Sequence, residues 1–239
     1  IFKIEYPILL LSSILGMFIM ISSNDLMVFY LGLELQSLAL YVLASFKRND
    51  QLSSESGLKY FVLSALSSGL LLYGCSLIYG FSGSTNFDQI SNNISEVQYG
   101  LTLGIVFILV GLAFKISAVP FHMWAPDVYQ GSPTSVTIFF AILPKIAALS
   151  VFIRFLYVPF INLIDQWQTI IIFVSIASMV FGAVAAIGQK NLKRLMAYSS
   201  ISHMGFALAG LAVGTNEGIQ SSIIYLSLIH ISEPTRRNS

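Results

Sequence analysis

Long apolar runs separated by short polar stretches organise the whole chain. A helix needs about 20 apolar residues to cross about 30 Å of hydrocarbon. Seven runs approach or exceed that length, and an eighth begins at Gly218 and stops early. The seven runs cover approximately residues 6–23, 26–46, 57–81, 99–130, 134–156, 168–188 and 195–213. This pattern predicts an all-α, polytopic membrane protein.

Composition excludes several other classes of protein. Of the 239 residues, 56% are hydrophobic and 10% are charged, against about 25% charged in an ordinary soluble domain. A net charge of +1 without a long basic run argues against nucleic-acid binding. The single cysteine, Cys75, excludes a disulfide framework or a cysteine-ligated cluster within this chain. We therefore expect Cys75 to pack in the core.

Basic residues between the runs predict the orientation in the membrane. If the runs alternate in direction and 99–130 counts as one crossing, all basic loop residues lie on one side, while the opposite loop at 82–98 contains no Lys or Arg. Cytoplasmic loops carry the excess of positive charge. We therefore place this side in the cytoplasm or matrix, with the basic residues Lys3, Lys47, Arg48, Lys190, Lys193 and Arg194.

Ionisable residues inside the runs are the candidate functional residues. Each one costs about 2.5–3.5 kcal/mol at mid-membrane on insertion scales, so retaining several favours a proton path. The candidates are Glu34, Lys115, Lys145 and His203. A static ion pair of Glu34 with Lys115 is one alternative to a proton path. For His203, a hydrogen bond between helices is as good an explanation as a role in such a path. Arg154 lies near the end of its run, where a long side chain can reach the interface.

The stretch KISAVPFHMWAPDVYQGSPTS interrupts the fourth run. Its three prolines remove backbone donors and disfavour helix at the preceding residues, so the sequence predicts a discontinuous helix directly after Lys115. Broken helices of this kind occur at ion sites in transporters. His122, Trp124 and Asp127 are expected to cluster at the inner mouth, although Trp124 is equally an interface anchor. Too few further ligands surround them for a metal site.

Three motifs resemble one known family. GLAFKISAVPFHMWAPDVYQGSPT, FFAILPKIAAL and GQKNLKRLMAYSSISHMGF are similar to segments of the antiporter-like subunits of respiratory complex I, most of all the subunit N branch. The resemblance extends to about Tyr225 and is shared with the large subunits of multisubunit sodium/proton antiporters. It implies two inverted five-helix repeats and places the family's proton-carrying residues on Glu34, Lys115, Lys145 and His203.

The resemblance also implies what this chain works with. It implies a proton-translocating membrane-arm subunit that couples electron transfer from NADH to quinone to proton pumping. NADH, FMN, iron-sulfur clusters and quinone would belong to partner subunits, and this chain would hold no cofactor or metal. The expected neighbours are the antiporter-like subunit M, small membrane-arm subunits and the lipid bilayer. The expected location is a bacterial plasma membrane or the mitochondrial inner membrane, and a sodium/proton antiporter subunit is the alternative.

The chain is expected to be a fragment of such a subunit. Residues 1–226 would form a partial proton-translocating domain, and residues 227–239 would be a tail that does not resemble the family. The run from Gly218 to Ile231 is too short to span a membrane comfortably. No role is assigned to residues of the final stretch SLIHISEPTRRNS.

Overall fold

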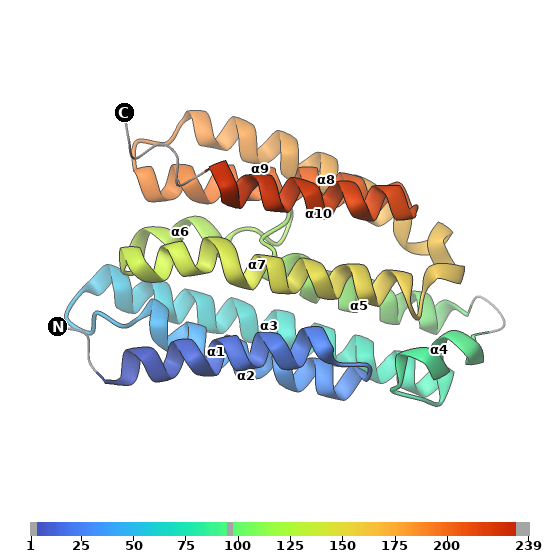
Figure 1. The fold of residues 1–239 in the computed structure, drawn as a ribbon. Coiled ribbons are helices and arrows are strands. Elements are labelled where there is room, and N and C mark those ends of the chain that lie inside the picture. Colours follow the sequence, from blue (N-terminus) through green and yellow to red (C-terminus); the bar gives the residue numbers. More distant parts are fainter. Residues whose placement is uncertain (1–3, 95–97, 233–239) are drawn as a thin grey trace.

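The structure, a computed structural model, describes residues 4–94 and 98–232, which form an elongated helical bundle (Figure 1). Within this part of the chain, six helices are long and apolar enough to cross a membrane. The predicted all-α membrane fold is therefore confirmed. The helices are α1 (Glu5–Ser22), α2 (Leu26–Ala44), α3 (Gln51–Ser82), α4 (Phe87–Asn93), α5 (Tyr99–Lys115), α6 (Trp124–Gly131), α7 (Thr134–Tyr157), α8 (Ile164–Ile187), α9 (Leu192–Ala212) and α10 (Asn216–Ser232).

The helices pack as two groups joined through α6 and α7, and α6 contacts α3 and α9. Helix α1 packs on α2 and α3 packs on α5, while α8 packs on α9 and α9 on α10. Helix α7 contacts α1 and α5 on one side and α9 and α10 on the other, and it lies between the two groups in Figure 1. Helices α5 and α6 run in the same direction and together make one crossing, and the short helix α4 makes none. The segment from α1 to α7 therefore crosses the bundle five times. Helix α8 therefore starts at the opposite end from α1, as inverted repeats require.

The predicted discontinuous helix is present. Helices α5 and α6 are separated by residues 116–123, and the gap lies near the middle of the bundle (Figure 1). Pro120 accounts for the interruption, because it removes a backbone donor in this stretch and disfavours helix at Val119. Pro144, in contrast, lies inside α7 without ending it.

The start of α3 differs from the prediction because polar residues form the first turns of this helix. Helix α3 begins at Gln51, six residues before the apolar run, because the side chain of Asp50 accepts from the amide of Leu52 and caps the helix. Ser53 then donates to the carbonyl of Ala44 at 2.9 Å. The polar start of α3 is thus packed against the end of α2.

The second difference is α4, which lies in the stretch expected to be an irregular loop. Asn86 caps this helix by accepting from the Asp88 and Gln89 amides, and Phe87 and Ile90 are buried beneath it. An apolar pair three residues apart after an asparagine was the available sequence signal. Helix α4 closes the end of the bundle where α1 meets α2.

Asp25 organises this corner between α1 and α2. Its side chain accepts from the Met27 and Val28 amides as the cap of α2 and from the hydroxyl of Thr85. Burial alone would raise the pKa of Asp25, but these hydrogen bonds outweigh it and hold the pKa below its usual value. The charged carboxylate therefore stays as the cap of α2.

Glycines allow α1 and α2 to approach closely. A Cβ atom added at Gly16 would lie 2.5 Å from the backbone nitrogen of Gln36, and one at Gly32 would lie 2.7 Å from that of Met20. Small residues at such crossings let helices pack backbone against backbone in membranes. This contact fixes the helix that carries Glu34.

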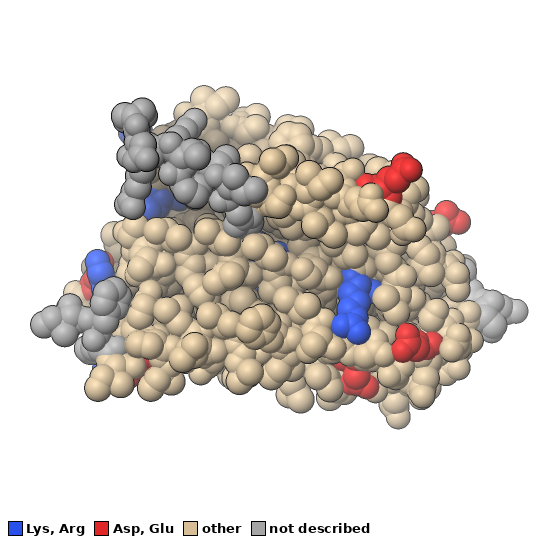
Figure 2. All heavy atoms as spheres, viewed as in Figure 1, with Lys and Arg blue, Asp and Glu red and all other residues tan. Residues whose placement is uncertain are grey.

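One face of the bundle carries few charged residues. Figure 2 shows a face that is mostly uncharged, with acidic and basic atoms mainly toward its ends. The loops after α2 and α8, with Lys47 and Lys190, lie at one end of the bundle, as the alternation of helices requires (Figure 1). The predicted common side for the basic residues is consistent with this topology, although Lys3 lies outside the described residues.

Candidate functional site

Lys115 is the last residue of α5, and its side chain is only 6% exposed. Beyond it the chain turns sharply, and Ser117 adopts a left-handed backbone with φ of 57°. Such a conformation is uncommon for a residue other than glycine. The end of α5 therefore places a buried amine and a buried serine side by side at the helix break.

Side chains satisfy the backbone groups that the break exposes. The amide of Val119 donates to Ser178 Oγ on α8 at 2.9 Å. The indole of Trp124 donates to the carbonyl of Phe114 at 2.8 Å. Non-helical backbone at membrane depth requires such partners, because no water is available in hydrocarbon. The expectation that Trp124 anchors the interface is wrong, since it is 3% exposed and stacks on Tyr60 at 4.6 Å.

Hydroxyl groups surround the Lys115 amine. Nζ donates to Ser37 Oγ on α2 at 2.7 Å and to Ser64 Oγ on α3 at 2.8 Å. The phenol of Tyr41 also donates to Ser64 Oγ, at 2.6 Å. The amine is therefore held by neutral groups from two helices.

Glu34 lies on α2 and is half-buried. Among the described residues, the Oε1 atom of Glu34 has no hydrogen-bond partner, and no ion pair within 4.0 Å joins it to Lys115. The direct contact that a static clamp needs is therefore not present, so the interaction expected between the two residues stays a prediction of a through-space electrostatic effect.

Lys145 lies on α7 and is 3% exposed. Its Nζ donates to Ser117 Oγ at 2.9 Å and also to Ser200 Oγ on α9. The Tyr129 ring lies on another side, with its centroid 5.6 Å from Nζ. The helix break therefore connects the two lysines, because it begins at Lys115 and supplies the Ser117 partner of Lys145.

His203 lies on α9, half-buried and outside this cluster. Its Nδ1 atom is 2.8 Å from the hydroxyl of Tyr225 on α10. This contact fits an interhelical hydrogen bond and also fits a relay, so both roles remain predictions for His203.

The polar cluster expected at the inner mouth does not form as predicted. Asp127 pairs instead with Lys59 on α3 at 2.9 Å and with Arg194 on α9 at 2.5 Å. His122 lies against the ring of Phe181, with centroids 4.4 Å apart. Long basic side chains reach Asp127 from both flanking helices, whereas His122 points toward α8. Asp127 thus fixes α6 between α3 and α9.

Arg154 also makes more specific contacts than an interface residue would. It donates to the carbonyl of Ile21 at 2.8 Å and to Asn24 Oδ1 at 3.3 Å. The carbonyl belongs to the last turn of α1, where no further helical donor follows. Arg154 therefore ties α7 to the end of α1.

The serine partners were not identified as candidates from the sequence. Serines occur throughout the apolar runs, and nothing in the sequence separates those that contact lysine from those that bond to their own helix. Helix rotation and packing decide which serines contact a lysine. The only signal that the sequence offers is that serines recur within apolar helices. The four serines that contact the lysines are Ser37, Ser64, Ser117 and Ser200.

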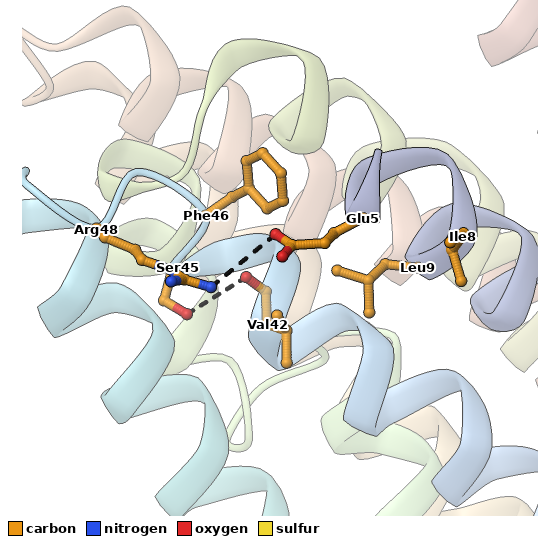
Figure 3. A pocket seen from close by; sticks show the side chains of 7 residues that line it. All are labelled: Glu5, Ile8, Leu9, Val42, Ser45, Phe46 and Arg48. Atoms are coloured by element: carbon orange, nitrogen blue, oxygen red, sulfur yellow. Dashed lines mark hydrogen bonds and ion pairs between the residues drawn. The ribbon is translucent and has the colours of Figure 1, made fainter. Parts of the chain in front are cut away.

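A surface pocket elsewhere is not part of this cluster. A pocket of about 390 Å³ lies between the start of α1 and the end of α2, lined by Ile8, Val42 and neighbouring residues (Figure 3). At its rim Glu5 and Arg48 form an ion pair at 3.9 Å, and both side chains are exposed. None of the candidate proton-carrying residues lines it. Within the described residues, no group of three or more His, Cys, Asp and Glu side chains is placed to hold a metal ion.

The cluster has the groups that proton exchange requires. Two amines lie inside the bundle, and the groups that contact them are hydroxyls and two aromatic rings, Phe114 and Tyr129. Burial without a fixed counter-charge penalises the charged amine and so brings its two protonation states closer in free energy. The arrangement therefore permits each lysine to bind and release a proton.

Comparison with known proteins identifies similar chains. Residues 23–233 match the family described as NADH:quinone oxidoreductase/Mrp antiporter, TM. The chain is 79% identical over 228 residues to NADH-quinone oxidoreductase subunit N of Pelagibacter ubique, covering 95% of this chain and 48% of that protein. The chain thus spans about half the length of the curated relatives it matches.

Solved structures give the same picture. A chain of respiratory complex I from Thermus thermophilus matches with a TM-score of 0.78 and 34% identity, covering 95% of this chain and 51% of that one. A chain of the Mrp complex from Dietzia sp. matches with a TM-score of 0.85 and 26% identity, covering 92% of this chain and 42% of that one. The antiporter-like helix bundle expected from the sequence is confirmed.

Proposed function

The chain belongs to the NADH:quinone oxidoreductase/Mrp antiporter family, and we propose that it forms the proton-carrying part of a complex I membrane-arm subunit of the N type. The observation that carries this proposal is the pair of buried lysines, Lys115 and Lys145. Lys115 lies directly before the helix break, and Lys145 donates a hydrogen bond to Ser117 within the break. Intramembrane ionisable groups of this kind mark proton pathways.

Proton movement in this proposal runs along the middle of the bundle. Glu34 acts on Lys115 from α2, and Lys145 lies across the break. When one amine gives up a proton and the other receives it, the first becomes neutral and the second charged. His203, hydrogen-bonded to Tyr225, would receive the proton next on the way toward α10.

The energy for this movement would come from other subunits. In the proposed complex, partners bind NADH, FMN, iron-sulfur clusters and quinone, while this chain contributes the proton path. The neighbouring antiporter-like subunit M and small membrane-arm subunits would contact it. Since curated relatives that are 79% and 60% identical to this chain are bacterial proteins, we place it in a bacterial plasma membrane.

A multisubunit sodium/proton antiporter is the second candidate function, because the chain also resembles the Mrp complex. Purification of the tagged full-length protein from its native membrane separates the two. Recovery with NADH-oxidising subunits supports the complex I role. Recovery in a complex that exchanges Na⁺ for H⁺ without oxidising NADH would contradict it.

Replacing Glu34 with Ala should lower proton pumping by the complex several-fold while the complex still assembles. The carboxylate acts on Lys115 without a direct ion pair, so its loss changes proton affinity more than packing. Pumping into liposomes per NADH oxidised is the measurement. Glu5→Ala is the control, since Glu5 is exposed at the start of α1. Equal pumping by Glu34→Ala and the control would remove Glu34 from the path.

A further inference from the structure

The two serines that hold Lys115 differ in where their own protons go. Ser37 Oγ donates its proton to the carbonyl of Leu33 at 2.6 Å. A serine hydroxyl has one proton and two lone pairs. With its proton committed, Ser37 serves the Lys115 amine only as an acceptor, at 2.7 Å. Ser37 therefore favours the charged amine, which has protons to donate.

Ser64 has the opposite arrangement. Its oxygen accepts from Lys115 at 2.8 Å and from the phenol of Tyr41 at 2.6 Å, which uses both lone pairs. It is fully buried, and no hydrogen bond from its own hydroxyl to another described residue is present. The proton of Ser64 is therefore available to an acceptor that appears beside it.

We propose that Tyr41 and Ser64 are positioning residues that hold Lys115 in its neutral state, while Ser37 holds the charged state. When the ammonium passes its proton to the next carrier, the nitrogen gains a lone pair. The Ser64 hydroxyl then turns about its Cβ–Oγ bond and donates to that lone pair, while Tyr41 continues to donate to Ser64. Neither hydroxyl loses its proton. This inference rests on the proposed proton-carrying role of Lys115.

Donation by Tyr41 makes Ser64 a better donor, because hydrogen bonds in a chain polarise one another. The same donation competes with the ammonium for the oxygen of Ser64. Tyr41 therefore shifts the balance toward the neutral amine, and Ser37 shifts it toward the charged one. Lys115 can change protonation state in place, without a permanent ion pair.

The hydroxyls are the groups that hydrogen-bond to the Lys115 amine directly. Glu34 is expected to act on Lys115 only through space, and Lys145 is held by Ser117 and Ser200. The titratable groups on the helices around Lys115 include Glu34 and Tyr41 on α2, Tyr60 on α3, Asp127 and Tyr129 on α6, and Lys145 on α7.

Lys145 shows part of the same arrangement. Ser117 Oγ donates to the carbonyl of Ile116 at 2.6 Å, so it too can only accept from the lysine. Ser200 Oγ also accepts from Lys145, while the phenol of Tyr129 donates to the carbonyl of Phe140 at 3.3 Å. Each buried lysine thus has one serine acceptor whose own proton is committed to a backbone carbonyl.

The test compares Tyr41→Phe with Ser37→Ala in the full-length subunit within the assembled complex. Proton pumping per NADH oxidised is measured in liposomes as a function of pH. Without Ser37 the charged amine loses an acceptor, so the pH profile should shift to lower pH. Without the Tyr41 hydroxyl the neutral amine is less well held, so the profile should shift to higher pH. A neutral hydrogen bond corresponds to a shift of about 0.7 pH unit for Tyr41→Phe, and a hydrogen bond to a charged group corresponds to about 1–2 pH units for Ser37→Ala.

Tyr73→Phe is the matched control, because Tyr73 lies on the outer face of α3 and is 55% exposed. Its profile should match that of the unchanged complex. Shifts of Tyr41→Phe and Ser37→Ala in the same direction, or no shift, would overturn the inference. Tyr41→Phe keeps the ring, so it decides alone if Ser37→Ala does not assemble. Unimpaired pumping by Lys115→Met would instead overturn the proposed function.

Discussion

Replacing Lys145 with Met should lower coupled NADH oxidation and proton pumping by about tenfold or more, because proton transfer then loses a positioned acid and base. Methionine retains much of the side-chain volume, so the core around Ser117 and Ser200 should remain packed. Pumping by the purified complex in liposomes is the measurement. The NADH oxidation rate with an artificial acceptor reports whether the remaining complex is intact.

Arg154→Gln is the matched control for Lys145→Met, since both residues are cations on α7. Arg154 contacts Ile21 and Asn24 at the end of α1 and none of the lysines. Its replacement should destabilise the junction of α7 with α1 modestly and leave pumping per NADH unchanged. An equal loss of pumping in both variants would show that Lys145 has no special role.

Replacing Gly32 with Leu should remove most of the folded subunit from the membrane. Even a Cβ at this position would lie 2.7 Å from the backbone nitrogen of Met20, so α1 and α2 must separate. Overpacking of a close contact typically costs about 1–3 kcal/mol, and here the obstacle is backbone rather than a flexible side chain. The amount of assembled complex on native gels is the measurement.

Gly69→Leu provides the comparison for Gly32→Leu. Gly69 also lies within a membrane-spanning helix, α3, but a Cβ there meets nothing within 4 Å. Assembly of this variant should match that of the unchanged protein. If both leucine variants assembled equally well, the close approach of α1 and α2 would not matter for folding.

The sequence predicted the spanning helices because hydrocarbon thickness imposes a minimum apolar length. It also predicted the break after Lys115, since proline removes a backbone donor wherever it occurs. The start of α3 was misplaced, because capping by Asp50 and burial of Ser53 outweigh local polarity. Helix α4 was missed since it is too short for periodicity to identify it.

The charged residues of the candidate site could be chosen from the sequence, whereas their contacts could not. An ionisable residue deep in an apolar run is conspicuous by its cost. The partners of Lys115 come from α2 and α3, up to 78 positions away in the chain. The rotation of each helix decides which residues become such partners. For ion pairs, it also matters which basic side chain is placed to reach which carboxylate. Asp127 illustrates this, because Lys59 and Arg194 reach it and His122 does not.

The most direct test of the central claim is the number of protons pumped per NADH oxidised by the complex carrying Lys115→Met. This variant keeps α5 and the break but removes the amine that Ser37 and Ser64 hold. If this chain carries protons, the complex should assemble, and pumping and coupled NADH oxidation should fall severely. An assembled complex that pumps as many protons per NADH, at the same rate, as the unchanged one would contradict the claim.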